Sequence, residues 1–168
     1  MKKLFLWAVA TVFLAACQSE DITPEVSIEG KWNLVEVQSG WDSTVTPVSE
    51  SYPYSESYEF RTNGTFVKFN TLLGIELTGT YIEEFYESSE GDNYPAVKIL
   101  TLTFDPEILE KILETDESGR TIYWSHDPHF WIIYSAYDAI ETMILRTDGS
   151  IANHGRGWAD TPVYYYRK

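Results

Sequence analysis

Two short runs joined by a tight turn make up residues 57–69, SYEFRTNGTFVKF. In residues 57–61, and again in 65–69, large apolar side chains alternate with polar ones, which is typical of half-buried β-strands. Between the two runs, Asn63-Gly64 is a dipeptide that adopts positive φ angles at low cost. The segment therefore predicts a β-hairpin.

Similar alternation recurs along the rest of the chain. The runs are short, are separated by turn residues and follow one another at nearly regular spacing. This pattern predicts an all-β fold, an antiparallel up-and-down β-barrel of about eight strands. The further strands are expected at residues 28–37, 75–85, 97–104, 121–124, 130–134, 142–146 and 163–168.

Loops and glycines add detail to this pattern. Residues 38–54 are rich in Ser, Thr and Pro and predict a long loop, and residues 86–95 predict an acidic turn. Gly79 lies inside a strand and predicts a bulge or a bend. Asp148-Gly149 predicts another turn.

One short helix is expected among the strands. Asp105 is a suitable N-cap, Pro106 suits the first helical position, and Glu107 complements the positive end of the helix dipole. These signals predict an amphipathic helix of about ten residues that ends before Gly119 and packs over the sheet. Its apolar stripe consists of Ile108, Leu109, Ile112 and Leu113.

The N-terminus has the features of a lipoprotein export signal. Lys2 and Lys3 supply positive charge, residues 4–14 form an apolar run, and Ala15-Ala16 precede Cys17. The run is shorter than the roughly 20 residues that a membrane-spanning helix needs. We therefore expect cleavage before Cys17 and a lipid anchor on that residue. The alternative is an ordinary secretory signal that happens to be followed by a cysteine.

This signal divides the chain into three parts. Residues 1–16 are the expected signal peptide, residues 17–27 a polar, flexible tether, and residues 28–168 a single barrel domain. Gln18 is not the aspartate that retains lipoproteins at the inner membrane, so an outer-membrane address is favoured. Ser19-Glu20-Asp21 resembles a signal for export to the cell surface, or is simply a solvated acidic tether, so the domain is expected to face the periplasm or the cell surface.

Charge and cysteine content restrict the possible partners. Removal of residues 1–16 leaves 10 Lys and Arg against 26 Asp and Glu, a net charge of −16. No basic cluster offers a surface for phosphate groups, so nucleic acid is excluded as a partner. Cys17 is the single cysteine of the chain, so the domain contains no internal disulfide.

Four short motifs, in this order and spacing, resemble the bacterial lipocalin-like domain found in many small lipoproteins. The resemblance covers residues 28–168 and implies a lipocalin-like barrel at the cell envelope, with no established shared ligand. The motifs are Gly30-Lys31-Trp32, Phe60-Arg61-Thr62-Asn63-Gly64-Thr65-Phe66, Gly79-Thr80-Tyr81 and Tyr165-Tyr166-Arg167-Lys168.

The resemblance also implies a structural role for three residues. In lipocalins, the tryptophan of a Gly-x-Trp motif closes the floor of the barrel, and an arginine from a late strand stacks on its ring. Gly30, Trp32 and Arg167 match those positions. A guanidinium group over an indole ring is worth about 0.5–2 kcal/mol, so this pair would fasten the first strand to the last.

Metal binding has two candidate segments. His126-Asp127-Pro128-His129, with His154, contains ligand types that zinc uses, but Asp-Pro also favours a plain hairpin loop. A second group of acids could hold calcium, yet it lacks the spacing of a dedicated calcium loop and is better explained as solvated. Its members are Glu83, Glu84, Glu87, Glu90 and Asp92.

Enzymatic motifs are absent from the sequence. It contains no Gly-x-Ser-x-Gly elbow, no phosphate-binding glycine loop, no dinucleotide fingerprint and no cysteine nucleophile within the domain. A catalytic pair of carboxylates stays possible only because 26 acids always offer some pair. We expect a non-enzymatic protein without a cofactor.

Aromatic residues are the remaining candidates for binding. One hypothesis is that the barrel holds a small apolar or amphipathic ligand, since barrels of about eight strands can enclose one. The other is that loop aromatics form a surface for a glycan or a protein partner. The same aromatics could instead fold back and plug the barrel. The candidate residues are Trp41, Tyr52, Tyr54, Trp124, Trp131 and Trp158.

Overall fold

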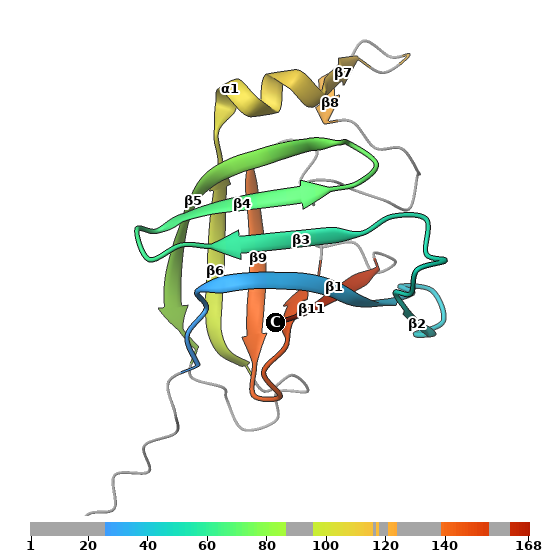
Figure 1. Ribbon diagram of the computed structural model, residues 1–168, viewed down its shortest axis with the longest axis vertical. Helices are drawn as coiled ribbons and strands as arrows, with labels where there is room; N and C mark the ends of the chain where they lie inside the picture. Colours follow the sequence, from blue (N-terminus) through green and yellow to red (C-terminus); the bar gives the residue numbers. More distant parts are fainter. Residues whose placement is uncertain (1–25, 87–95, 116, 118–120, 124–138, 155–161) are drawn as a thin grey trace, which may run out of the picture.

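The computed structural model describes residues 26–86, 96–115, 117, 121–123, 139–154 and 162–168 (Figure 1). Short strands dominate these residues, and one short helix follows β6. The elements are β1 (Gly30–Gln38), β2 (Val45–Pro47), β3 (Glu56–Phe60), β4 (Thr65–Asn70), β5 (Ile75–Phe85), β6 (Ala96–Phe104), α1 (Pro106–Leu109), the 3₁₀ turn η1 (Glu110–Ile112), β7 (Leu113–Thr115), β8 (Thr121–Tyr123), β9 (Ile140–Arg146), β10 (Ile151–Asn153) and β11 (Val163–Arg167).

Eight of these strands form a closed antiparallel barrel. Their order is β1-β3-β4-β5-β6-β9-β10-β11, and β11 pairs with β1 to close the ring. Consecutive barrel strands are neighbours, so the topology is up-and-down. The all-β barrel of eight strands with one short helix confirms the sequence-based expectation. In Figure 1, β1, β3 and β4 cross in front of β6 and β9, and α1 covers the upper end.

The hairpin at residues 57–69 forms as its sequence predicts. Phe60 pairs with Phe66 across the turn, and Gly64 has a φ of 76°. The Asn63 side-chain oxygen accepts hydrogen bonds from the backbone N–H and the hydroxyl of Thr65, at 3.2 and 2.7 Å. The turn therefore fixes the register that places Tyr58 and Phe60 inside the barrel.

Of the bulge or bend expected at Gly79, the bulge is not found, and the glycine instead permits close strand packing. The β4–β5 and β5–β6 pairings run through it without a register shift. A β-carbon at this position would lie 2.1 Å from the Thr103 carbonyl oxygen and 2.7 Å from the Phe66 ring. The absence of a side chain lets β5 approach β6 and the Phe66 ring together.

The helix is shorter than its sequence pattern predicts. Asp105 caps it as expected, because its carboxylate accepts a hydrogen bond from the backbone N–H of Glu107 at 3.0 Å. After Leu109, however, the chain tightens into a 3₁₀ turn, and Leu113 begins β7, which pairs with β8. The last residue of the expected apolar stripe, Leu113, thus belongs to a strand and not to the helix. Of the other stripe residues, Leu109 and Ile112 are buried.

Three short strands were not expected from the sequence. They are β2, β7 and β10, each of three residues. A run of three residues is too short to display an alternating pattern. The strand expected at residues 130–134 lies outside the described part of the chain.

Large side chains fill the described interior of the barrel. Aromatic rings from β1, β3, β4, β6 and β11 meet there, including an edge-to-face contact of 5.0 Å between Phe66 and Phe104. The largest fully buried side chains are Trp32, Tyr58, Tyr166, Phe60, Phe66, Lys68, Phe104, Ile28, Leu77, Leu100 and Leu102. Lys68 is the single charged residue in this set, and it leads to the polar cluster described next.

Candidate functional site

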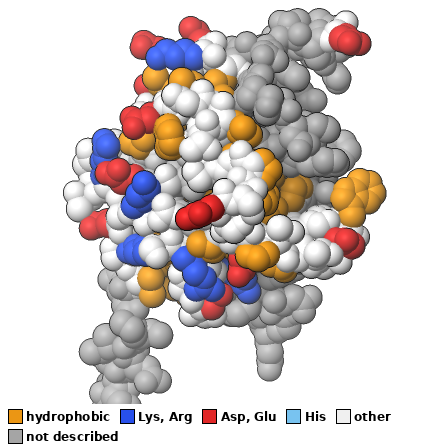
Figure 2. Space-filling view, turned by 45° about the vertical axis from the view of Figure 1, so that its right-hand side comes forward, with side chains coloured by type: hydrophobic (Ala, Val, Ile, Leu, Met, Phe, Trp, Pro, Cys, Tyr) orange, Lys and Arg blue, Asp and Glu red, His pale blue; other side chains and the backbone are white. Residues whose placement is uncertain are grey.

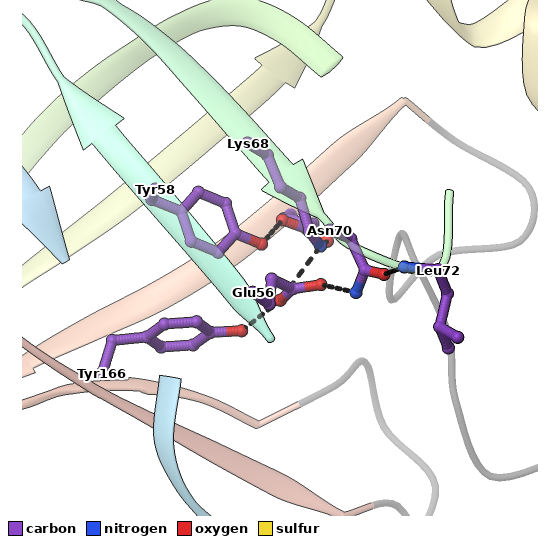
Figure 3. Close-up of polar contacts among 7 residues, drawn as sticks. Glu56, Tyr58, Lys68, Asn70, Leu72 and Tyr166 are labelled. Carbon is purple, nitrogen blue, oxygen red and sulfur yellow. Dashed lines mark hydrogen bonds and ion pairs between the residues drawn. The ribbon is translucent and has the colours of Figure 1, made fainter. Parts of the chain in front are cut away.

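A cluster of charged and polar side chains lies buried inside the barrel (Figure 3). Its centre is the Lys68 ammonium group, which lies 2.9 Å from Glu141 Oε1 and 3.6 Å from Glu56 Oε1. The three side chains are at most 3% exposed. The barrel therefore buries two carboxylates against one ammonium group, and we call Glu56, Lys68 and Glu141 the ionic triad.

Hydroxyl and amide groups complete the hydrogen bonding of the triad. Tyr58 donates to Glu141 Oε2 at 2.6 Å, and Tyr166 donates to Glu56 Oε1 at 2.5 Å. The Asn70 amide donates to Glu56 Oε2 at 2.9 Å. Figure 3 shows Glu56, Lys68 and Tyr166 pointing toward one another from β3, β4 and β11. Each oxygen of both carboxylates thus has a donor, as buried charges require.

Burial alters the acidity of three groups in this cluster. It raises the pKa of Glu141 above the usual value for glutamate, although Lys68 and Tyr58 oppose part of the rise. Burial, together with the nearby carboxylate charges, also raises the pKa values of Tyr58 and Tyr166 well above the usual value for tyrosine. Both phenols therefore remain protonated donors at every physiological pH.

The triad ties four strands together across the interior. Glu56 lies on β3, Lys68 on β4 and Glu141 on β9, and Tyr166 adds β11. All four carboxylate oxygens of Glu56 and Glu141 already accept hydrogen bonds from within the cluster. These contacts do not favour a bound metal or cofactor. The arrangement can hold the strands in register and can bind a proton, but it does not present an open reacting group.

Sequence reasoning missed the ionic triad, although a signal was present. Glu56 is in phase with Tyr58 and Phe60 on β3, and Glu141 is in phase with Met143 and Leu145 on β9. In the same way, Lys68 follows Phe66 by two positions on β4. Because a strand alternates its faces, each charged residue had to lie on the apolar face. Charge alone had favoured a surface position.

The floor of the barrel is closed by Lys168 where Arg167 was expected. Trp32 is 1% exposed and donates its indole N–H to the Ile28 carbonyl at 2.6 Å. The Lys168 ammonium lies 5.0 Å from the centre of the Trp32 ring and donates to the Ser27 carbonyl at 2.7 Å. Gly30, with a φ of 107°, turns the chain into β1 in a conformation that favours glycine.

Arg167 points away from that ring. The strand alternates, so Tyr164 and Tyr166 lie in the core and Arg167 is exposed. Its guanidinium pairs with Asp148 at 3.1 Å and thereby fastens β11 to the β9–β10 turn. The expectation that Arg167 stacks on the Trp32 ring is therefore wrong. Strand alternation directs Arg167 outward, and the next residue, Lys168, contacts the ring.

The loop aromatics are divided between core and surface. Tyr54 is buried, and Tyr52 packs edge-on against it with ring centres 5.1 Å apart. Trp41 is 74% exposed. Tyr52 and Tyr54 thus belong to the core, and Trp41 alone of these three is free to meet a partner. Trp124, Trp131 and Trp158 lie outside the described residues.

Trp41 lies in the hydrogen-bonded turn of the hairpin formed by β1 and β2. The Ser39 N–H donates to the Thr44 carbonyl at 2.8 Å, and the Asp42 carboxylate accepts from the Thr44 N–H at 3.0 Å. The hydrogen bond from the Thr44 backbone N–H, together with the Ser39 and Thr44 side chains, lowers the pKa of Asp42, so its carboxylate is charged. The backbone N–H of Trp41 donates to the Ser39 hydroxyl at 3.2 Å. The indole is therefore carried on a hydrogen-bonded turn with polar neighbours.

The metal-site candidates receive no support from the described residues, which contain no cluster of three or more metal-ligating side chains. Glu83 pairs with Lys98 at 2.9 Å, next to an open hollow of about 290 Å³ lined by Ser27, Ile28, Glu29, Glu83 and Lys98. Glu84 is exposed. Residues 126–129, Glu87, Glu90 and Asp92 lie outside the described part of the chain.

Comparison with known proteins supports the reading of the N-terminus. Residues 1–18 match the family model of the prokaryotic membrane lipoprotein lipid attachment site. The chain is a lipid-anchored lipoprotein. No curated protein and no solved structure matches it significantly. None of the described helices has the length and apolar character needed to cross a membrane.

Proposed function

We propose that this lipoprotein is a non-enzymatic binding module of the outer membrane that holds a neutral glycan against Trp41. The observation that carries the proposal is the 74% exposure of a tryptophan on a hydrogen-bonded hairpin. Binding residues are often carried on loops, and a tryptophan offers a large apolar ring surface to a ligand. The resemblance to envelope lipoproteins with a lipocalin-like domain supports a location at the cell envelope. Gln18 after the lipid-bearing cysteine, where an inner-membrane lipoprotein has aspartate, supports the outer membrane.

Three features favour a neutral sugar as the occupant. The flat indole suits the apolar face of a sugar ring, and the same turn carries the polar residues Ser39, Asp42 and Thr44. Of the aromatics in the loop before β3, Trp41, Tyr52 and Tyr54, only Trp41 is exposed, and one ring is a small anchor for a protein interface of about 800 Å² per partner. The charge of −14 disfavours an anionic partner.

The surface charges agree with this choice. On the face shown in Figure 2, acidic and basic side chains are interspersed. Such a surface does not offer the concentrated positive charge that an anionic polymer requires. A neutral chain that stacks on one aromatic ring meets no such requirement.

A ligand inside the barrel has less support. The described interior holds the aromatic rings of Trp32, Tyr58 and Phe66 at no more than 1% exposure, and the ionic triad lies among them. An apolar ligand would have to displace these side chains and contact buried charges. Protein interiors resist such insertion, because overpacking costs about 1–3 kcal/mol even for a few added methylenes.

The test is binding of the purified lipoprotein, held in detergent micelles, to a panel of insoluble neutral polysaccharides. Trp41→Ala should weaken binding at least tenfold and leave the melting temperature nearly unchanged, because an exposed side chain contributes little to stability. Phe85→Ala is the matched control, since Phe85 is 77% exposed and belongs to β5. It should bind like the wild type.

Other outcomes would contradict the glycan proposal. One is a wild-type protein that binds none of the polysaccharides. Another is a Trp41→Ala variant that unfolds, which would make Trp41 a core residue. If the wild type instead retained an envelope protein and Trp41→Ala lost it, the partner would be a protein.

A further inference from the structure

The ionic triad has one more negative group than positive groups. Glu56 and Glu141 both contact the Lys68 ammonium, at 3.6 and 2.9 Å, so the two carboxylates lie close together around one cation. All three side chains are at most 3% exposed. In such a poorly solvated place an unbalanced charge is costly, and one added proton would balance it.

Every described element around Glu141 leaves this imbalance in place. From β3, Glu56 adds negative charge and Tyr58 a neutral donor, and from β4, Lys68 adds the one positive charge that the described residues place on the Glu141 oxygens. The strands that pair with β9 contribute Leu100 and Leu102 from β6 and Asn153 from β10. Tyr166 from β11 and Tyr54 before β3 face Glu56 as neutral phenols.

Of the two carboxylates, Glu141 is the better place for the proton. Glu56 accepts hydrogen bonds from Tyr166 and Asn70 in addition to its contact with Lys68. Glu141 accepts from Lys68 and Tyr58. A hydroxyl group both donates and accepts, so Tyr58 can turn and accept a bond from a protonated Glu141. The Tyr166 hydroxyl could turn in the same way at Glu56, so the difference between the two carboxylates is the number of groups that favour the charged form: three contact Glu56 and two contact Glu141.

We propose that the ionic triad is a proton-linked clasp, in which Glu141 takes up one proton from solvent in mildly acidic conditions and the barrel becomes more tightly held. The added proton makes the triad neutral as a whole. Lys68 then pairs with Glu56 without competition from a second carboxylate. The clasp joins β3, β4 and β9, so its strength affects the closed barrel as a unit.

The sign of the pH effect follows from the raised pKa of Glu141. A carboxyl group that holds its proton more tightly in the folded state stabilises that state below its unfolded pKa of about 4.3 and loses the effect as pH rises through the folded value. The contribution of Glu141 to stability should therefore grow as pH falls from neutral into the mildly acidic range.

The test compares thermal unfolding of the full-length lipoprotein and of Glu141→Gln in micelles between pH 8 and pH 5. Glutamine imitates the protonated acid, so the variant should lack the wild type's gain on acidification. The gain is a rise in the melting temperature of the wild type relative to the variant, and each tenfold change in the folding equilibrium corresponds to about 3–5 °C for a domain of this size. Glu84→Gln removes an exposed carboxylate and should follow the wild type.

Parallel pH profiles for the wild type and Glu141→Gln would overturn the proposal. A second measurement covers the case in which Glu141→Gln does not fold. In wild-type protein with ¹³C-labelled glutamate, one side-chain carboxyl signal should titrate at a clearly higher pH than the ordinary glutamate signals near 4.3. If every glutamate signal titrates near the ordinary value, the proposal fails.

Discussion

Lys68 is the residue on which the interior of the barrel depends most. Its side chain is 1% exposed, its ammonium contacts two buried carboxylates, and it also lies 5.0 Å from the centre of the Tyr58 ring. Breaking a buried ion pair on one side is costly, because the remaining charge stays in a place that cannot solvate it. Lys68 is thus a position where a single substitution has a large and specific effect.

Lys68→Met should lower the free energy of unfolding by about 3–5 kcal/mol, because it leaves Glu56 and Glu141 facing each other without a cation. Adding Glu141→Leu should restore part of this loss. Urea unfolding at neutral pH measures both. Lys111→Met, at an exposed lysine, is the matched control and should stay within about 0.5 kcal/mol. A Lys68→Met loss no larger than that of Lys111→Met would contradict the role given to Lys68.

At the scale of elements, Gly79 decides how closely β5 lies against its neighbours. Gly79→Ala would place a β-carbon 2.1 Å from the Thr103 carbonyl oxygen and 2.9 Å from the Phe104 α-carbon. Both are backbone atoms, so the strands themselves must move. We expect a loss at or above the upper end of the about 1–3 kcal/mol typical of overpacking.

Gly149→Ala is the comparison for Gly79→Ala in denaturant unfolding. Gly149 has a φ of 76° and nothing within 4 Å of an added β-carbon. Its substitution strains the turn by about 1–2 kcal/mol without a clash. If Gly79→Ala lowers the free energy of unfolding less than Gly149→Ala does, the close approach of β5 and β6 at Gly79 is contradicted.

The sequence predicts the strands where a regular pattern is long enough to read. β5 agrees with the expected range of residues 75–85, and the β3–β4 hairpin agrees to within one residue at each end. β10 has three residues, Ile151-Ala152-Asn153, and all three are buried, so no alternation marks it. β7 takes Leu113 from the helical stripe because it pairs with β8, a tertiary effect that local propensity does not include.

The site was harder to predict than the fold. Trp41 was singled out with Tyr52 and Tyr54, and only the structure separates the exposed ring from the two that pack into the core. The ionic triad joins residues that are 73 positions apart in the sequence, as in the Lys68–Glu141 hydrogen bond. Strand alternation places each of them inside, but which of them meet depends on barrel closure.

At the scale of the whole molecule, closure joins the two ends of the domain. β1 pairs with β11, and Lys168 reaches the Trp32 ring and the Ser27 carbonyl. The lipid attachment segment, residues 1–18, ends shortly before this point. The barrel is therefore closed by strands from the two ends of the domain, and the lipid attachment segment lies directly N-terminal to that closure.

The central claim is that this barrel is filled by its own side chains and binds its partner outside. Native mass spectrometry of the lipoprotein, purified from its own membrane and released from micelles, tests it most directly. We expect the mass of the lipidated chain that begins at Cys17, with no small molecule retained. A stoichiometric apolar or amphipathic molecule that stays bound to the folded domain and is lost on unfolding would contradict the claim.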